Sequence, residues 1–174
     1  PSTYNFHESR NYVDYTDDIY VGYRYFETIP GAAEKVVYPF GYGLSYTTFD
    51  VETVSAGVVN SNCTSEANKL YAKVRVTNTG KFSGKEVVQV YIAKPQGKLG
   101  KPAKELAAFE KTRELQPGES QLMILTWEIN DMASYDDLGK VKKSAYVLEA
   151  GSYDIYVGTS VRDVTKADYS YILN

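Results

Sequence analysis

Two pairs of adjacent carboxylates are the residues of this chain whose types could most readily take part in catalysis. Asp17 and Asp18 form one pair, and Asp136 and Asp137 form the other. Paired carboxyl groups can act as general acid and base when both face the same reacting bond. Adjacent residues on an extended chain point to opposite faces, which is poor geometry for that task. We expect both pairs to lie in solvated turns, because catalysis would need one of them in a deep pocket with a shifted pKa.

The other reactive residue types are too sparse to form a catalytic or metal-binding group. His7 is the only histidine and Cys63 the only cysteine, which excludes a histidine cluster, zinc-type spacing and an internal disulfide. We expect His7 at the surface and Cys63 as an incidental thiol. The chain has no nucleophile elbow and no phosphate-binding glycine loop, and its sequon at residues 62–64 is short enough to arise by chance. The sequence thus predicts no catalytic residue, no metal and no cofactor.

Charge and hydropathy exclude two classes of partner. A net charge of -3 and a pI near 5.3 give no electrostatic reason to expect nucleic acid as a partner, because binding phosphates needs clustered positive charge. No apolar run approaches the ~20 residues of a membrane-spanning helix. The densest basic stretch, residues 94–104, is interrupted by glycines and prolines and is expected to be a solvated loop. The chain starts without methionine or a signal-like segment, so we expect a fragment whose cellular location is unknown.

The elements that must position these residues are mainly short strands. Residues 70–78 alternate between an apolar and a polar face, and residues 86–93 are apolar on both faces, which predicts a central strand. Further strands are expected at 49–59, 106–115, 120–129, 146–149, 151–159 and 168–173. We expect a helical turn at 130–136, capped by Asn130 or Asp131, and one strand or extended crossing at 19–26. This spacing predicts an all-β, two-sheet sandwich of about seven strands with an irregular N-terminal extension.

A junction rich in aromatics and glycine separates the extension from the strands. It runs from Tyr38 to Phe49 and reads Y-P-F-G-Y-G-L-S-Y-T-T-F, in which Gly41 and Gly43 allow a tight turn. Together with I-Y-V-G-Y-R-Y-F at residues 19–26, the junction resembles the signature that links the sandwich domain to the fibronectin type III-like domain in family 3 glycoside hydrolases, the β-glucosidase family. Later motifs follow in the family's order, among them V-R-V-T-N-T-G at 74–80 and G-S-Y-D-I-Y-V-G at 151–158. The resemblance covers nearly the whole chain.

This resemblance implies a fibronectin type III-like, or immunoglobulin-like, β-sandwich at residues 46–174. Residues 1–45 would be an extension or linker from the preceding sandwich domain. In that family the nucleophile is an aspartate of the barrel domain, and the acid/base lies in the barrel or the sandwich domain; no segment here matches the nucleophile motif. The implied role is therefore that of a non-catalytic accessory domain, packed on the catalytic domains of a retaining enzyme that hydrolyses β-glucosidic or related O-glycosyl bonds. Carbohydrate would be met only through that parent enzyme. Whether the parent carries this region at its C-terminus or in its middle stays open.

Aromatic side chains indicate where the contact with a neighbouring domain would lie. Trp127, Tyr91, Tyr153 and Tyr156 fall on strands and are expected in the core. The aromatics of the extension and junction are too many to be buried by the extension alone. Arg24 lies among them and could pair with a carboxylate, or stack on a ring, of a neighbouring domain. We predict an interdomain contact made by Tyr23, Arg24, Tyr25, Phe26, Tyr38, Phe40, Gly41, Tyr42, Gly43 and Tyr46.

A second interpretation is an independent carbohydrate-binding or cell-surface adhesion module. It predicts a row of exposed aromatic side chains on one sheet face, and affinity of the isolated domain for a polysaccharide. The first interpretation predicts instead that exposed aromatics gather around the extension and the junction, as on an orphaned contact surface.

Overall fold

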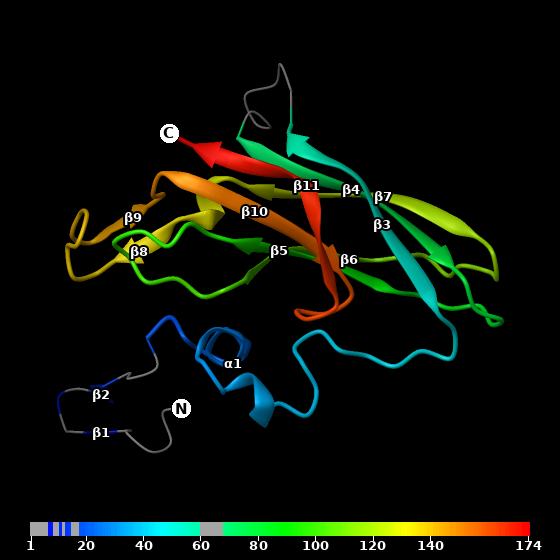
Figure 1. Cartoon of the computed structure of the whole chain (residues 1–174), viewed down its shortest axis with the longest axis horizontal. Coiled ribbons are helices and arrows are strands. Elements are labelled where there is room, and N and C mark those ends of the chain that lie inside the picture. The colour runs from blue at the N-terminus through cyan, green and yellow to red at the C-terminus, as the bar shows by residue number, and fades with distance from the viewer. Residues whose placement is uncertain (1–6, 9–10, 12, 15–17, 60–67) are drawn as a thin grey trace.

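A β-sandwich preceded by an extended leader makes up the structure (Figure 1). The computed structural model describes residues 7–8, 11, 13–14, 18–59 and 68–174. Asp17 and the sequon that contains Cys63 lie outside the described residues, as does the side chain of His7. Near the N-terminus, β1 (His7–Glu8) pairs with β2 (Val13–Asp14). We call residues 18–48 the leader.

Two antiparallel sheets face each other in the sandwich. One sheet has the spatial order β11 (Val164–Leu173), β10 (Gly151–Gly158), β5 (Val87–Ala93) and β6 (Glu105–Lys111). The other has the order β3 (Phe49–Val58), β4 (Lys69–Asn78) and β7 (Ser120–Glu128). Spatial neighbours that are distant in sequence, such as β5 and β10, are typical of immunoglobulin-like sandwiches. The predicted all-β, fibronectin type III-like class is confirmed, and β5 is an interior strand as expected.

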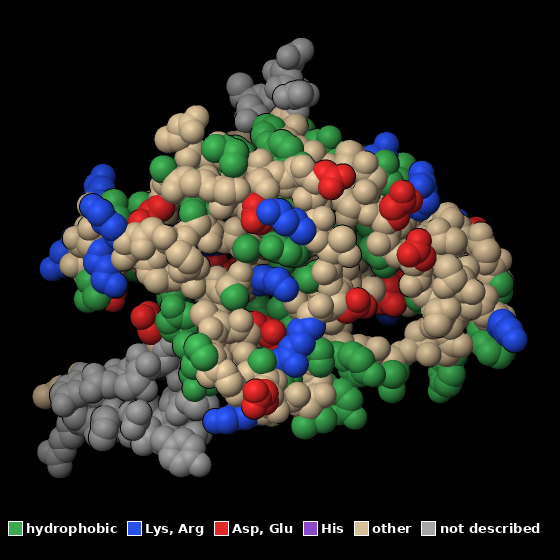
Figure 2. All heavy atoms as spheres, in the orientation of Figure 1, with side chains coloured by type: hydrophobic (Ala, Val, Ile, Leu, Met, Phe, Trp, Pro, Cys, Tyr) green, Lys and Arg blue, Asp and Glu red, His purple; other side chains and the backbone are tan. Residues whose placement is uncertain are grey.

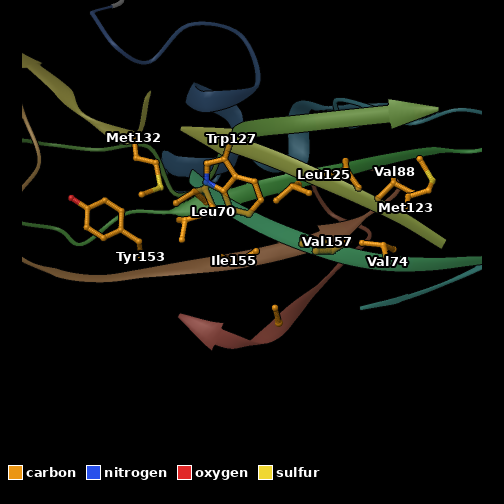
Figure 3. Close-up of a cluster of buried hydrophobic side chains, with 14 of the residues drawn as sticks. Leu70, Val74, Val88, Met123, Leu125, Trp127, Met132, Tyr153, Ile155 and Val157 are labelled. Atoms are coloured by element: carbon orange, nitrogen blue, oxygen red, sulfur yellow. The ribbon is translucent and has the colours of Figure 1, made fainter. Parts of the chain in front are cut away.

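The core lies between the two sheets and uses every second residue of their strands. On β4, Leu70 and Val74 are completely buried, and they share one apolar cluster with Val88 of β5 and Met123 of β7 (Figure 3). Burial of each such side chain contributes about 1.5–3 kcal/mol. Because a shift of one residue would turn this whole set toward solvent, the alternation also fixes the register of β4 against β7.

Three of the four strand aromatics lie in the interior, as expected. Tyr91, Tyr153 and Trp127 are each at least 95% buried. Tyr156 is different, because it is only half-buried and its ring lies 5.1 Å from the Lys104 ammonium. The core prediction for Tyr156 was therefore wrong: its ring lies under a cation instead.

The segment predicted as a strand or extended crossing at residues 19–26 is instead partly helical. Helix α1 spans Tyr23–Thr28, and a short 3₁₀ turn, η2 (Ala33–Lys35), follows it. The high content of β-forming residues in this segment pointed to a strand. However, the segment lies across the face of a sheet. On a face, unlike at an edge, no strand is free to pair with it. A helix satisfies its backbone groups locally, so it fits that position better.

The basic loop at residues 94–104 is not the solvated loop that its composition predicted. Lys101 is 2% exposed and Leu99 is 6% exposed. The loop wraps around Glu149, whose carboxylate pairs with the Lys101 ammonium and accepts the backbone N–H of Lys98 (2.6 Å). The lysine is buried because its charge has a partner, which composition alone does not reveal.

A small hairpin projects at one end of the sandwich (Figure 1, left). Its strands are β8 (Ser134–Asp136) and β9 (Ala145–Val147), and β8 follows the 3₁₀ turn η3 (Asn130–Met132). The helical turn predicted at residues 130–136 covers only residues 130–132, because residues 134–136 form β8. The predicted cap was wrong: Ile129 occupies the cap position and no side chain caps the turn. The expected strand at 106–115 is also shorter, because β6 ends at Lys111.

Candidate interdomain contact surface

The leader covers the outer face of the sheet that contains β5, β6 and β10. Several hydrogen bonds hold it there: the Ala103 N–H donates to the Thr28 hydroxyl (2.8 Å), and the Val161 N–H donates to the Phe40 carbonyl (2.9 Å). The Arg162 guanidinium pairs with Glu27 (2.8 Å). The leader is therefore a fixed third layer on this face, which explains why both faces of β5 are buried.

Tyr23 is the main inward contact of the leader. Its ring stacks on Phe40 with centroids 4.4 Å apart and meets Tyr91 edge-on at 6.2 Å. Its hydroxyl oxygen accepts the backbone N–H of Leu106 (2.8 Å). Beneath it, the hydroxyl of the fully buried Tyr91 donates to the Gln89 side-chain oxygen (2.5 Å), and burial raises the pKa of Tyr91 well above its ordinary value. This predicted contact residue thus serves packing within the chain.

Gly41 gives the junction its turn. The Tyr42 N–H donates to the Pro39 carbonyl (3.0 Å), and Gly41 has a φ of 83°, which is the pattern of a type II turn. A Cβ at Gly41 would also collide with the Gln89 side chain, whose amide donates to the Gly41 carbonyl (3.2 Å). Gly43 has no such constraint: its φ is not positive and nothing lies within 4 Å of a Cβ placed there.

The outward side of the junction carries exposed aromatic and aliphatic side chains. Tyr46 is 96% exposed and Tyr38 is 69% exposed, and the Tyr38 ring stacks on that of Tyr42 with centroids 5.3 Å apart. In Figure 2, hydrophobic side chains gather along the lower edge of the molecule, where Figure 1 shows the junction. We define the junction surface as Val37, Tyr38, Phe40, Tyr42, Leu44 and Tyr46. Val37 and Leu44 were missing from the predicted set, although Leu44 is an apolar residue inside the motif and Val37 lies directly before the motif.

Both ends of the junction are anchored, so its exposed side chains have defined positions. At the C-terminal end, the buried Thr47 hydroxyl donates to the Asn78 side-chain oxygen (2.7 Å), and the Thr79 N–H donates to the Thr48 carbonyl (2.9 Å). The Asn78 amide in turn donates to the Leu115 carbonyl (2.8 Å). An ordered apolar strip that stays exposed in this way is a candidate contact site.

A hollow flanks the junction on each side. One, of about 390 Å³, lies between the junction and α1 and includes Phe26, Tyr38 and Phe40 in its lining. The other, of about 750 Å³, lies between the junction and β5, with Tyr42 and Leu44 on its wall. With two hollows beside a ridge of exposed rings, the surface has a shape that a complementary protein surface can fit.

The predicted contact residues therefore divide into two groups. Arg24 pairs with Glu105 of β6 (3.5 Å), and Tyr25 and Phe26 are half-buried and meet edge-on at 5.4 Å. Like Tyr23 and Gly41, Arg24 contacts other parts of this chain. The members that remain exposed are Tyr38, Phe40, Gly41, Tyr42, Gly43 and Tyr46, of which Gly41 also accepts a hydrogen bond from Gln89.

The candidate catalytic carboxylates do not form an acid–base pair. Asp18 is exposed, but Asp136 is 1% exposed, so the prediction of a solvated turn was wrong for Asp136. Its two carboxylate oxygens accept four backbone N–H groups, those of residues 139–142, at 2.7–3.0 Å. Burial alone would raise the pKa of Asp136, but these donors outweigh it and hold the pKa below its ordinary value. Asp136 is thus a fully satisfied anion that orders the hairpin loop.

Asp136→Asn is expected to loosen the loop between β8 and β9 while leaving the sandwich intact. The amide retains one acceptor oxygen and places an NH₂ group against N–H donors, so the amides of residues 139–142 should exchange with deuterium several-fold faster. The pKa of Asp136 is lower in the folded chain than in the unfolded one. The stabilisation of the loop by the ionised carboxylate is therefore complete above the ordinary pKa of about 3.9, and it disappears as the pH falls through the folded pKa. Amide exchange measured by NMR tests this. Asp137→Asn is the matched control, and equal exchange in the two variants would contradict the role of Asp136.

Two further features are absent from the described part of the chain. No group of three or more His, Cys, Asp or Glu side chains that could hold a metal ion occurs among the described residues. Within the same residues, no helix is both long and apolar enough to cross a bilayer.

Comparison with known proteins identifies what the chain resembles. A family model described as fibronectin type III-like domain matches residues 86–161. β-Glucosidase A of Butyrivibrio fibrisolvens is 59% identical over 182 residues, which is all of this chain and 22% of that protein. The β-glucosidase structure from Paenibacillus barengoltzii superposes with a TM-score of 0.87 at 49% identity, covering 99% of this chain and 19% of that one.

A GH3 β-glucosidase from Bifidobacterium adolescentis is also similar, with a TM-score of 0.80 at 34% identity, over 99% of this chain and 23% of that one. The chain thus spans about a fifth of the length of the relatives it matches. Sequence, fold and coverage agree over essentially all 174 residues. The chain belongs to the family 3 glycoside hydrolases, as the region of these proteins that contains the fibronectin type III-like domain.

Proposed function

We propose that this chain is a non-catalytic structural domain that packs on the catalytic domains of a β-glucosidase-like family 3 glycoside hydrolase, with the junction surface as its contact. The parent enzyme would hydrolyse O-glycosyl bonds with a nucleophile that lies outside this chain. The observation that carries the proposal is the ordered and unpartnered strip of exposed rings between Val37 and Tyr46.

The character of this strip supports a protein partner. Tyrosine and phenylalanine combine large apolar area with little conformational entropy and are enriched at protein interfaces. The strip includes Leu44 at 88% and Tyr46 at 96% exposure, and such side chains gain most from burial against another surface. Because the matched relatives are about five times as long as this chain, a neighbouring domain of the same polypeptide is the simplest partner.

The proposed division of the chain follows from the same reasoning. Residues 46–174 would form the fibronectin type III-like domain, and residues 1–45 would be the extension from the preceding domain. The change from the loop-rich leader to β3 at Phe49 supports this division. Because the leader also covers β5, the extension would hold the two domains in a fixed orientation.

Substitution in the parent enzyme tests the proposal. The double variant Tyr38→Ser/Tyr46→Ser is expected to lower the Tm of the full-length enzyme by several degrees, because the neighbouring domain loses two buried rings. The same double variant should leave the Tm of the isolated chain unchanged, since both rings are exposed there. Differential scanning calorimetry on both proteins measures the two effects.

An exposed tyrosine outside the junction supplies the matched control. Tyr146 on β9 is 77% exposed, so Tyr146→Ser should leave both Tm values unchanged. A loss of Tm for the double variant that is equal in the parent enzyme and in the isolated chain would contradict an interdomain role. Hydrolysis of a β-glucoside by the purified 174-residue chain would contradict the non-catalytic role.

The alternative of an adhesion module or an exposed carbohydrate platform has less support. Such a platform would place a row of exposed aromatics on one sheet face. Among the described residues of the two sandwich sheets, only Phe109 of β6 is an exposed aromatic side chain. The outward face of the β3-β4-β7 sheet exposes aliphatic residues, namely Val54, Leu122 and Ile124.

A further inference from the structure

The loop between β4 and β5, residues 79–86, carries an exposed phenylalanine. Phe82 is 63% exposed. Figure 1 shows this loop beside the start of β3, where the junction ends. The Thr79 and Thr48 hydroxyl groups are hydrogen-bonded to each other (3.0 Å), in addition to the backbone hydrogen bond between the same two residues. The β4–β5 loop is thus attached directly to the C-terminal end of the junction.

Two glycines allow the β4–β5 loop to approach the junction closely. A Cβ placed on Gly80 would lie 2.1 Å from the Thr47 hydroxyl oxygen and 2.7 Å from the Thr48 backbone nitrogen. A Cβ on Gly84 would lie 2.8 Å from the methyl carbon of Thr47. These separations are too short for atoms that are not bonded, so a side chain at Gly80 would move the loop away from the junction. The close packing therefore depends on residues that lack a side chain.

The buried side chain of Asn78 holds the loop and the junction together. Its amide donates to the Phe82 carbonyl (2.7 Å). Its oxygen accepts the Gly80 N–H (3.0 Å) and the Thr47 hydroxyl (2.7 Å). One fully buried side chain thus fixes the backbone of Phe82 relative to that of the junction. Because this backbone is already ordered, Phe82 would lose little conformational freedom when another surface covers its ring.

A shallow hollow of about 250 Å³ lies between the loop and the junction. The junction lines it with residues 45–48, and the loop lines it with residues 80–82. Two of the lining residues carry large rings, Tyr46 at 96% exposure and Phe82 at 63%. Both rings can therefore be reached from outside the chain.

The hollow fits an apolar side chain better than a polar or charged guest. The hydroxyl groups of Thr47 and Thr48 are already hydrogen-bonded within the chain. Among the described residues, Lys81 is the only charged one that lines the hollow. The surfaces that remain for a guest are the two rings, and aromatic rings gain free energy when apolar groups cover them.

The position of the hollow indicates where such a side chain would come from. Tyr46 belongs to the junction surface, so the hollow continues the surface that is proposed to contact a neighbouring domain. The matched relatives are about five times as long as this chain, and a domain of the same polypeptide is again the simplest partner. A pocket that receives one apolar side chain within a larger contact is typical of an interface hot spot.

We propose that an apolar side chain of the neighbouring domain inserts between Tyr46 and Phe82 when the two domains pack. The contact then has two segments, the junction surface and the β4–β5 loop, and Asn78 holds them in one arrangement. This inference rests on the proposed packing role and adds to it a second segment and a point of insertion.

Hydroxyl-radical footprinting of the full-length parent enzyme and of the 174-residue chain tests the proposal. Exposed tyrosine and phenylalanine rings are oxidised quickly and covered rings slowly, and mass spectrometry gives the rate for each residue. We expect Tyr46 and Phe82 to be oxidised several-fold more slowly in the parent enzyme than in the isolated chain. Tyr146 on β9, which is 77% exposed, should be oxidised at the same rate in both proteins.

The oxidation of Tyr38 separates failure of this inference from failure of the packing role. If Tyr38 is protected in the parent enzyme and Phe82 is not, the insertion is wrong and the packing role stands. If Tyr38, Tyr46 and Phe82 are all oxidised at the same rate in both proteins, both proposals are wrong. Protection of Phe82 that disappears when the parent enzyme is diluted would mean that a second copy covers the hollow, which also overturns the insertion.

Two variants of the parent enzyme test whether Tyr46 and Phe82 contact the same side chain. Tyr46→Ser and Phe82→Ser should each lower its Tm by a few degrees, and together by less than the sum, because the second change removes contacts that the first has already loosened. In the isolated chain Phe82→Ser should change the Tm little, since the ring is exposed there. Fully additive losses in the parent enzyme, or an equal loss in the isolated chain, would contradict insertion between the two rings.

Discussion

Lys101→Met is expected to lower the free energy of unfolding by about 3–5 kcal/mol, which is a large part of the stability of a domain of this size. The variant would leave the Glu149 carboxylate, whose side chain is only 10% exposed, without the ammonium that pairs with it. The two backbone N–H groups of Lys98 and Leu99 would remain as its only donors in the loop. Denaturation in guanidinium chloride, followed by the fluorescence of Trp127, measures the change.

The pH dependence of that loss identifies its cause. Burial alone would raise the pKa of Glu149, but the hydrogen bonds from Lys101 and the loop backbone outweigh it and lower the pKa. The stabilisation is therefore complete above the ordinary glutamate pKa of about 4.3 and disappears as the pH falls through the lowered folded value. The difference in free energy of unfolding between wild type and Lys101→Met should become smaller in acid, where Glu149 is protonated in both proteins. Arg75→Met, which breaks the exposed pair with Glu52, is the control and should change stability little.

Tyr23→Ala is expected to lower the free energy of unfolding by about 2–3 kcal/mol and to loosen the leader from the sheet. The substitution removes the stacking on Phe40, the edge contact with Tyr91 and the acceptor for the Leu106 N–H. Deuterium exchange should rise most in α1 and at Leu106. Urea denaturation and exchange mass spectrometry measure the two effects.

The phenylalanine variant separates packing from hydrogen bonding at this position. Tyr23→Phe keeps the ring contacts and loses only the hydroxyl acceptor, so it should cost about 1 kcal/mol. Tyr38→Ala removes an exposed ring of the same leader and should stay within about 0.5 kcal/mol of wild type. If Tyr23→Ala costs no more than Tyr38→Ala, the inward role of Tyr23 is wrong.

Most of the sandwich could be predicted from the sequence because its strands follow a local rule. The alternation in residues 70–78 matches burial residue by residue in β4, and the apolar residues on both faces of β5 correctly indicated an interior strand. The pattern does not say what covers each face. The second face of β5 is covered by the leader, whose propensities pointed to a strand and whose position on the sheet favours the helix α1.

The polar details could not be predicted, because they depend on how the folded chain places charged side chains and backbone groups and not on a repeating local pattern. Lys101 meets Glu149 across 48 positions, and composition alone made its loop look solvated. The burial of Asp136 depends on the fold of the loop that follows it, although Gly139, at a φ of 79°, gave a hint of a tight turn. For the predicted contact residues, the sequence could select aromatics near the motif, but only the fold separates Tyr23, turned inward, from Tyr46, turned to solvent.

The most direct test is a binding titration between this chain and the parent polypeptide from which the chain has been removed. Isothermal titration calorimetry is expected to give a saturable one-to-one complex with a negative heat-capacity change, the mark of apolar burial. Tyr38→Ser/Tyr46→Ser should weaken the complex by at least about tenfold, whereas Tyr146→Ser should not change it. Absence of a complex, or equal affinity for wild type and the double variant, would contradict the proposal that the junction surface holds this domain on its enzyme.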